Sequence, residues 1–382
     1  MLCRRIGKLT SPSSALTFKL TAQVTNSILL VTPTNFINRL RRQSGSCKPA
    51  WLAIAALFAL FISAGINAEL KCGSIHLTSG SDESTKLLSA IDELILETGF
   101  DCSIERAEND TEADIDITKP VLVSATAQSQ FDKLIDNPAG IDSLMSININ
   151  PITNAGHGWW ITPEAVAKHP ELKTVLDVLE HPELFSDSEN STHGLFFNCP
   201  KDQRCQHMNA NLFRAFDMKD KGWVQKIPVS QTDLDRSINN AIEQGQNWFG
   251  YYRSPSVMTG RHKMVKLDFG IEFAGVKNWR GCMVKPVADC DDPKPSAWSP
   301  THLQTVITDK LAATVPGEAL AYLTAREFPS DLMSTLLATQ YDKQLGTKET
   351  VRVFMLQHSL VWKPWVSADV ASKIINALST PH

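Results

Sequence analysis

The stretch GSIHLTSGSDESTKLLSAIDELILETGFDCSIERA, residues 73–107, decides the fold class of this chain. Its first eight residues alternate apolar and polar side chains, which is typical of a short β-strand. Residues 83–99 then repeat apolar side chains at helical spacing, and Gly99 is expected to end the helix. The apolar stripe consists of Leu87, Leu88, Ile91, Leu94 and Ile95. Strand character resumes after residue 100, so the stretch predicts a βαβ unit, a mostly parallel sheet and right-handed crossovers.

The rest of the chain continues the α/β pattern over a length too great for one core. A capped helix is expected from Thr232 to Gly245, and helical spacing dominates after residue 315. The 314 residues that follow position 68 exceed the size at which a single core usually stops growing. We therefore expect two lobes. The first is expected to combine residues 69–170 with 300–382, and the second to span 171–299.

The first 68 residues read as an N-terminal extension followed by a secretory signal. An uncharged apolar run at 51–64 follows a basic flank and precedes small residues, and cleavage is expected after Ala68. An uncleaved anchor is the alternative, but the run is shorter than the roughly 20 apolar residues of a spanning helix. We therefore predict a soluble protein exported to the periplasm.

The charge balance argues against nucleic acid as a partner. Residues 1–68 hold eight of the 37 Lys and Arg residues and no acid. In the remainder, 29 basic residues stand against 41 acidic ones, a net charge of −12. Such a chain would repel a phosphate backbone.

Six cysteines remain after the expected cleavage, and an even number in an exported chain favours disulfides. Six cysteines allow 15 pairings in principle. Sequence proximity suggests two local pairs and leaves a third. The suggested pairs are Cys199 with Cys205, Cys282 with Cys290, and Cys72 with Cys102.

A metal site and an enzyme are weaker interpretations. Cys199, Cys205 and His207 are close in sequence, but zinc sites usually have closer cysteine spacing and a second paired cluster. A disulfide-bonded cysteine cannot act as a nucleophile, and neither a nucleophile-elbow motif nor a P-loop motif is present. We expect no metal, no cofactor and no catalytic residues.

Four segments resemble the substrate-binding proteins of glycine betaine and choline-type ABC importers. They are GHGWWITPEAVAKHPELKTVLDVLEHPELF at 156–185, CPKDQRCQHMNANLFRAF at 199–216, WFGYYRSPSVM at 248–258 and CDDPKPSAWS at 290–299. The similarity extends over roughly residues 70–380, and the cysteine loop and the paired tyrosines are its most specific parts.

The resemblance implies a fold, a ligand class and partners. It implies a two-lobed periplasmic-binding-protein fold, similar to type II, with mixed, mostly parallel sheets flanked by helices and the ligand in the cleft between the lobes. Family members surround a quaternary ammonium with aromatic faces, which attract it by about 0.5–2 kcal/mol each. The implied partners are a small-molecule solute and an inner-membrane ABC permease with its ATPase. A sensory module of the same fold is an alternative that the fold does not exclude.

This chain departs from the family pattern at two aromatic positions. Gln203 stands where relatives commonly carry a Trp in the cysteine loop, with Arg204 after it, and Arg253 replaces a cage Trp after the paired tyrosines. Guanidinium groups repel a quaternary ammonium and pair with carboxylate, sulfonate or phosphate. We hypothesise that Arg204 and Arg253 hold an anionic group of the ligand. The alternative is that both arginines face water in a degenerate relative.

The remaining candidates are mostly aromatic. Adjacent residues of an extended segment point to opposite faces, so we expect one of Trp159 and Trp160 in the core and the other in the pocket. The same alternation favours Tyr252 slightly over Tyr251, and Trp298 is either a lid residue or a turn anchor. The expected ligand-binding residues are Trp159, Trp160, Gln203, Arg204, Cys205, Tyr251, Tyr252, Arg253 and His157.

Overall fold

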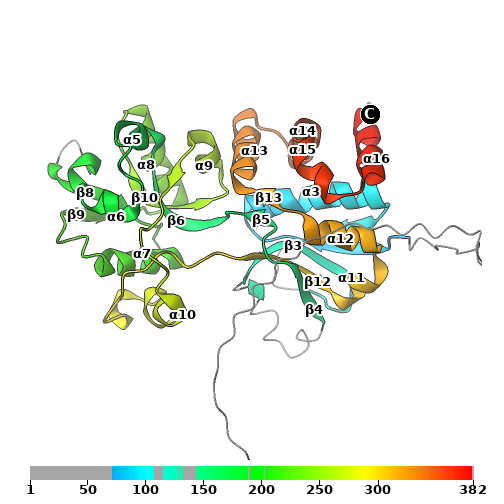
Figure 1. Ribbon diagram of the computed structural model, residues 1–382, viewed down its shortest axis with the longest axis horizontal. Coiled ribbons are helices and arrows are strands. Elements are labelled where there is room, and N and C mark those ends of the chain that lie inside the picture. Colours follow the sequence, from blue (N-terminus) through cyan, green and yellow to red (C-terminus); the bar gives the residue numbers. More distant parts are fainter. Residues whose placement is uncertain are drawn as a thin grey trace, which may run out of the picture. The chain divides into compact units, whose positions relative to one another are not determined.

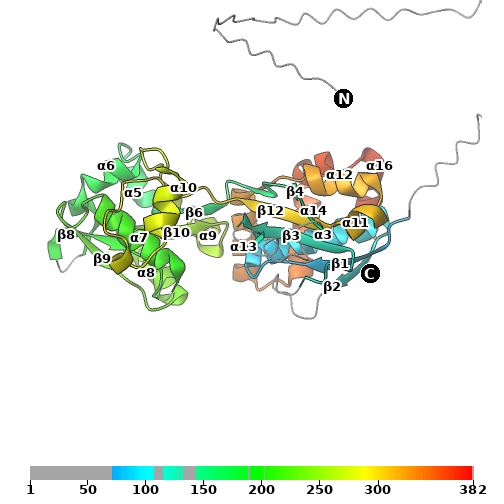
Figure 2. The same ribbon diagram turned by 90° about the horizontal axis from the view of Figure 1, so that it is seen from below.

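The computed structural model describes residues 71–106, 115–128, 130–131, 143–187, 190–201 and 203–380. The predicted signal peptide and its cleavage after Ala68 lie outside the described residues. Within the described part the chain is an α/β protein of two lobes, each built on its own sheet with its own helices (Figures 1 and 2).

The first lobe begins with the predicted βαβ unit. Strand β1 (Ser74–Thr78), helix α3 (Glu83–Phe100) and strand β2 (Ser103–Arg106) follow one another, and the two strands pair in parallel. The apolar stripe of α3 is buried except for the partly exposed Leu94. The helix does not stop at Gly99 as predicted, because Asp101 is its left-handed C-cap. Gly99 instead lets another helix approach, since a Cβ there would lie 2.8 Å from the Val370 side chain.

The first sheet is mixed rather than mostly parallel, with the order β2-β1-β3-β12-β4. Strand β12 comes from late in the chain and pairs antiparallel with both of its neighbours, so the C-terminal part returns to the first lobe. The added strands are β3 (Val121–Ala127), β4 (Leu144–Asn148) and β12 (Leu303–Thr308). Two further short strands, β5 (Ile152–Thr153) and β13 (Phe328–Pro329), pair in parallel beside it.

Helices of the C-terminal part complete the first lobe. They are α11 (Asp309–Thr314), α12 (Gly317–Ala325), α13 (Ser330–Lys343), α14 (Thr347–Gln357), α15 (Ser359–Trp362), η5 (Lys363–Trp365) and α16 (Ala368–Ser379). Their apolar faces join α3 in one core against the sheet. At its centre Arg326 is wholly buried and donates two hydrogen bonds to the carboxylate of Asp92 on α3, each 2.7 Å long. The ion pair therefore joins the C-terminal end of α12 to α3.

The second lobe is built on the strand order β11-β6-β10-β8-β7, with β9 beside β8. Strand β10 pairs antiparallel with β6 and parallel with β8, so this sheet is also mixed. The strands are β6 (Gly156–Ile161), β7 (Ser186–Asp187), β8 (Asn190–Phe197), β9 (Trp223–Lys226), β10 (Phe249–Ser254) and β11 (Val265–Lys266).

Short helices surround the second sheet. They are α5 (Pro163–Lys168), α6 (Val175–Leu179), η2 (Pro182–Phe185), α7 (Arg204–Ala215), α8 (Gln231–Glu243), α9 (Val257–His262), α10 (Gly275–Asn278), η3 (Trp279–Met283) and η4 (Val287–Asp289). Helix α8 starts one residue before the predicted Thr232 because Ser230 is its N-cap and accepts from the amide of Asp233.

We expect from the sequence that the chain first crosses between the lobes near residue 170. Strand β6 and helix α5 lie before residue 170, yet β6 is a central strand of the second sheet. We therefore propose that the first crossing lies between β5 and β6. The return crossing precedes β12, near the expected residue 300.

The three cysteine pairs suggested by sequence proximity are disulfide-bonded in the structure. They are Cys72–Cys102, Cys199–Cys205 and Cys282–Cys290. The first joins the beginnings of β1 and β2, and the other two close short loops of the second lobe.

Candidate functional site

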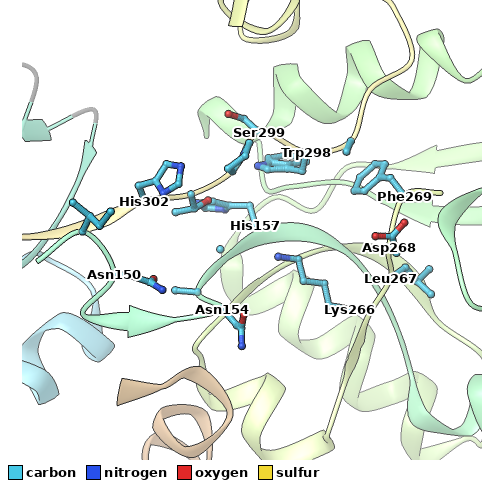
Figure 3. Close-up of a pocket in the computed structure, with 16 residues that line it drawn as sticks. Asn150, Asn154, His157, Lys266, Leu267, Asp268, Phe269, Trp298, Ser299 and His302 are labelled. Carbon is cyan, nitrogen blue, oxygen red and sulfur yellow. The ribbon is translucent and has the colours of Figure 1, made fainter. Parts of the chain in front are cut away.

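A cavity of about 510 Å³ lies where the chain passes between the two sheets (Figure 3). Three segments form its walls. The first ends in the opening residues of β6, the second begins in β11, and the third leads from the second lobe back to β12. These three walls are residues 149–157, 266–269 and 297–302, without the intervening 151–153. We call this space the linker cavity.

His157 is the second residue of β6. Of the ligand-binding residues expected from the sequence, it is the one that lines the linker cavity. Its Nδ1 atom is 2.6 Å from the hydroxyl of Tyr251, and the two rings stack with centroids 5.9 Å apart. Desolvation lowers the pKa of His157 to about 4, assisted by the positive charges of Arg253 and Lys266. The imidazole is therefore neutral at neutral pH and does not repel a cation in the cavity.

Trp298 completes an aromatic group beside His157. Its ring centroid is 6.0 Å from that of His157 and 5.4 Å from that of Tyr251, and Trp279 meets its ring edge-on at 5.4 Å. Trp298 is only partly buried and lines the linker cavity, with Phe269 nearby (Figure 3). The cavity therefore offers aromatic surface that is held in place by ring contacts behind it.

Two charged residues also line this cavity, and they come from one short stretch. The side chain of Lys266 extends into the cavity on the side opposite the Trp298 ring, and Asp268 lies below Phe269 (Figure 3). One carboxylate oxygen of Asp268 accepts a 2.6 Å hydrogen bond from the amide of Gly270, which fixes the carboxylate in a turn. The cavity thus carries an ammonium group, a carboxylate and aromatic faces.

Both tryptophans of the GHGWW segment are buried. Trp159 is 0% exposed, packs against Phe196, and donates a 2.8 Å hydrogen bond from Nε1 to Asn209. Trp160 is also buried, and its Nε1 donates to the backbone oxygen of Tyr252. Neither lines the linker cavity, although the alternation rule led us to expect one there.

The paired tyrosines point to opposite sides of β10, as the alternation of side chains along a strand predicts. The hydroxyl of Tyr252 donates a 2.5 Å hydrogen bond to Asp235 on α8, and its ring is buried. Tyr251 is the tyrosine that reaches His157 and Trp298. Tyr251 therefore supports the cavity wall from behind.

Arg253 is paired with an acid of the other lobe. Its guanidinium donates a 2.6 Å hydrogen bond to Asp82, which caps α3, and both side chains are about half exposed. The positive charge of Arg253 is thus already compensated within the protein.

The cysteine loop lies apart from the linker cavity. Gln203 is the N-cap of α7, Arg204 is the first residue of that helix, and both are exposed, while Cys205 is partly buried. The backbone of Lys201 donates to the oxygen of Pro228, which ties the loop to the segment after β9. The structure therefore does not bring Arg204 together with His157.

Sequence reasoning named Trp298 only as a lid or turn residue and missed Lys266 and Asp268. The sequence does carry one signal for Lys266, the two glycines of GHGWW, whose missing side chains allow a close approach. The group that approaches them is the side chain of Lys266 from the neighbouring strand.

Neither a metal centre nor a membrane span is visible in the described ranges. No group of three or more His, Cys, Asp or Glu side chains there could hold a metal ion. No helix within these ranges is long and apolar enough to cross a bilayer.

A family model for the substrate-binding domain of ABC-type glycine betaine transport systems matches residues 140–357. The chain belongs to this family. The family is one of solute-binding proteins rather than enzymes, and the match includes every wall of the linker cavity. No curated protein matches the chain in a sequence comparison.

Solved structures similar to this chain include other solute-binding proteins. An ABC-transporter choline-binding protein in complex with choline is 10% identical over 80% of this chain and 98% of its own, with a TM-score of 0.46. Lactococcal OpuAC in complex with glycine betaine is 12% identical over 78% and 99%, with a TM-score of 0.45. The glycine betaine/L-proline-binding protein from Borrelia burgdorferi is 10% identical over 79% and 99%, with a TM-score of 0.46.

Proposed function

We propose that this protein is the exported substrate-binding component of an ABC importer and captures a small solute of the glycine betaine class. The observation that carries this proposal is the linker cavity, which is lined by Trp298, His157 and Asp268 in a chain of this family. The importer's partners would be an inner-membrane permease and its ATPase.

The chemistry of the cavity suits a methylated ammonium group. Such a cation has no N–H to donate, so it is held by ring faces and by carboxylate charge. Trp298 and Phe269 supply ring surface, Asp268 supplies a negative charge, and His157 stays neutral at neutral pH. Micromolar binding needs about −8 kcal/mol, so several of these contacts must act together.

Capture would proceed by movement of the lobes. The cavity walls are the segments that connect the two sheets, so a solute there touches residues belonging to both lobes. A ligand that binds one arrangement of the lobes more tightly shifts the population toward that arrangement. The liganded form would be the one that docks on the permease.

The disulfides support an exported location. Disulfides persist in oxidising compartments such as the periplasm and are rare in the cytosol. Three of them occur in the described part, one in the first lobe and two in the second. This agrees with the signal peptide that we predict at residues 51–68.

Titration calorimetry of the exported protein tests the proposal. The panel would contain glycine betaine, choline and carnitine together with carboxylates and sulfonates that carry no ammonium group. We expect saturable micromolar binding of at least one quaternary ammonium, weakened at least tenfold in Trp298→Ala. A protein that bound none of the three ammonium compounds would contradict the proposal.

An anionic solute without an ammonium group is the second candidate, favoured by the Lys266 side chain in the cavity. The two arginines named from the sequence give it less support, because Arg253 is paired with Asp82 and Arg204 lies outside the cavity. Binding restricted to the carboxylates and sulfonates of the same panel would favour this candidate.

A further inference from the structure

Helix α9 lies between two strands of the second sheet but contacts the cores of both lobes. It follows β10 and precedes β11. Val257 packs against the core of the first lobe, whereas its neighbour Met258 is buried in the core of the second. The Nε2 atom of His262 lies 2.7 Å from the side-chain oxygen of Asn239 on α8. One short helix therefore has side-chain contacts with both lobes.

The contact of α9 with α13 is close at the level of the backbone, and the two helices lie side by side (Figures 1 and 2). A Cβ at Gly260 would lie 1.9 Å from the backbone oxygen of Ser334, so the approach requires a glycine. The hydroxyls of Ser254 and Ser330 are 2.7 Å apart, and Thr259 donates to the hydroxyl of Ser334 over 3.1 Å. These hydroxyl-bearing residues are buried, so separating the helices would break hydrogen bonds that water does not reach.

Charged side chains that are partly or fully exposed add a second layer to this contact. Arg261 forms an ion pair with Asp342, and its guanidinium carbon lies 5.0 Å from the ring centroid of Tyr341. Lys263, which follows α9, donates to the hydroxyl of Thr335 over 3.2 Å. A buried layer and an exposed layer thus hold α9 on α13.

Two other parts of the boundary between the lobes are looser. The linker cavity opens between the connecting segments, and the ion pair of Asp82 with Arg253 is about half exposed. A close-packed contact resists deformation, whereas an exposed ion pair separates into water at little cost. A movement of one lobe against the other is therefore least costly if it keeps α9 in place and changes the separation elsewhere.

We propose that α9 is the pivot of lobe movement: it stays on α13 in the ligand-free and the liganded protein, and the lobes turn about it to close on the solute. This inference rests on the proposed function and deepens it by naming the fixed point of the movement. The two chain connections, residues 154–155 and 297–302, take up the turn. Both line the linker cavity, so rotation about α9 changes the spacing of its walls.

A disulfide that locks α9 to α13 tests the pivot. The double variant Ser254→Cys with Ser330→Cys replaces two hydroxyls that are 2.7 Å apart, and a disulfide needs a Cβ separation of about 3.5–4.5 Å. Calorimetry measures the affinity for glycine betaine, choline or carnitine, whichever the wild type binds, and small-angle X-ray scattering measures the radius of gyration with and without it. We expect the locked protein to bind within about threefold of the wild type and to contract as the wild type does.

Matched variants separate the lock from the substitutions. The single variants Ser254→Cys and Ser330→Cys cannot form the new disulfide and should bind as the wild type does. Thr259→Cys with Ser334→Cys is a second lock at the same contact, where the hydroxyls are 3.1 Å apart. It becomes the decisive variant if the first protein does not fold. Mass spectrometry after alkylation of free thiols shows whether each lock has formed.

Hydrogen exchange of the wild type tests the pivot without any solute. The amide of Gly260 donates to the backbone oxygen of Ser256 inside α9. If α9 stays on α13, this amide should exchange about as slowly as the amides in the middle of α13, with or without solute. Exchange of α9 at the rate of an unfolded peptide would mean that the helix leaves α13, and it overturns the inference whatever the protein binds.

The outcomes separate this inference from the proposed function. A loss of affinity of about tenfold or more in the locked proteins, with the single variants unchanged, means that the lobes part at α9. That result overturns the inference, while wild-type binding upholds the proposed function. A wild type that binds solute without contracting has no lobe movement for α9 to guide, which also overturns the inference. If the wild type binds none of the three compounds, the proposed solute class fails, and the exchange rates decide whether α9 stays on α13.

Discussion

Two aspartate–arginine ion pairs of this protein join different parts of the fold. Asp92 and Arg326 join α3 to the end of α12 inside the first lobe, and both side chains are 0% exposed. Asp82 and Arg253 join the N-terminal end of α3 to β10 of the second lobe, and these side chains are 52% and 47% exposed. The buried pair is part of a lobe's core, whereas the exposed pair spans the two lobes.

The surroundings of the pairs differ as much as their exposure. Arg326 also donates to the backbone of Ser124 and to the hydroxyl of Thr305, and the Tyr322 hydroxyl donates to Asp92. Arg253 has one hydrogen bond to Asp82. A network in the core cannot be broken without burying an unpaired charge, while an exposed pair can separate into water at little cost. The difference suits a protein whose lobes stay rigid while the contact between them changes.

The largest expected effect comes from breaking the buried pair. Arg326→Met leaves the carboxylate of Asp92 without a cation inside the core, so we expect the free energy of unfolding to fall by about 3–5 kcal/mol. Urea denaturation followed by circular dichroism measures this. The double variant Asp92→Leu with Arg326→Met removes both charges and should recover much of the loss. A single variant as stable as the wild type would show that the network adds nothing.

The second effect is a pH dependence carried by His157. Its pKa is about 4 in the folded protein, below the ordinary value of about 6.5, because burial disfavours the imidazolium. As the pH falls from 6.5 to 4, the unfolded chain binds a proton that the native state does not, so stability is lost in that window. We expect up to about 1.4 kcal/mol per pH unit.

Urea titrations of the wild type and of His157→Gln at pH 7 and pH 4.5 isolate this contribution. The wild type should lose more stability between the two pH values than the variant, whatever their difference at pH 7. Equal losses would mean that His157 titrates normally in the folded protein.

A third effect tests a second contact between the lobes, the packing of α9 on α13. Helix α9 lies directly on α13: Thr259 donates to the hydroxyl of Ser334, and a Cβ at Gly260 would lie 1.9 Å from the backbone oxygen of Ser334. Gly260→Ala forces these helices apart, and we expect a loss of about 1–3 kcal/mol from overpacking. Gly281→Ala is the matched control, because nothing lies within 4 Å of the added methyl group. Equal stability of the two variants would show that the helices separate freely.

The sequence predicts features that depend on residues close together in the chain, and it does not predict contacts between distant residues. Local patterns located the βαβ unit, because strand alternation and the apolar stripe of α3 are short-range signals. The cysteine pairing followed from proximity in the chain for the same reason. Asp92 and Arg326 are 234 residues apart, and no local pattern connects them. The antiparallel insertion of β12 between β3 and β4 was not predicted, because it depends on the whole fold.

The candidate site was harder to predict than the fold. Alternation placed Tyr251 and Tyr252 on opposite faces of β10, but it could not say which face meets the linker cavity. The resemblance drew attention to Arg204 and Arg253, while Lys266 enters the cavity only because β11 pairs with β6 beside the two glycines. The partner of Arg253 is also distant in sequence, and Asp82 changes the interpretation of that arginine.

The smallest effect is expected from the exposed pair, and it bears directly on ligand binding. Arg253→Ala should change the free energy of unfolding by no more than about 1 kcal/mol. If the pair stabilises the arrangement of the lobes that binds solute, affinity should fall by about two- to fivefold at low salt. The loss should shrink at 1 M salt, where charges are screened beyond about 3 Å.

Arg236→Ala is the matched control for this last test. Arg236 pairs with Asp233 at 2.5 Å within a single helix of the second lobe, so its removal breaks an exposed ion pair without touching the contact between lobes. It should leave affinity unchanged at every salt concentration. A loss of a hundredfold or more in Arg253→Ala, persisting at high salt, would instead mean that Arg253 holds the ligand itself. Asp82 would then be a partner that the solute displaces, as the anion hypothesis drawn from the sequence requires.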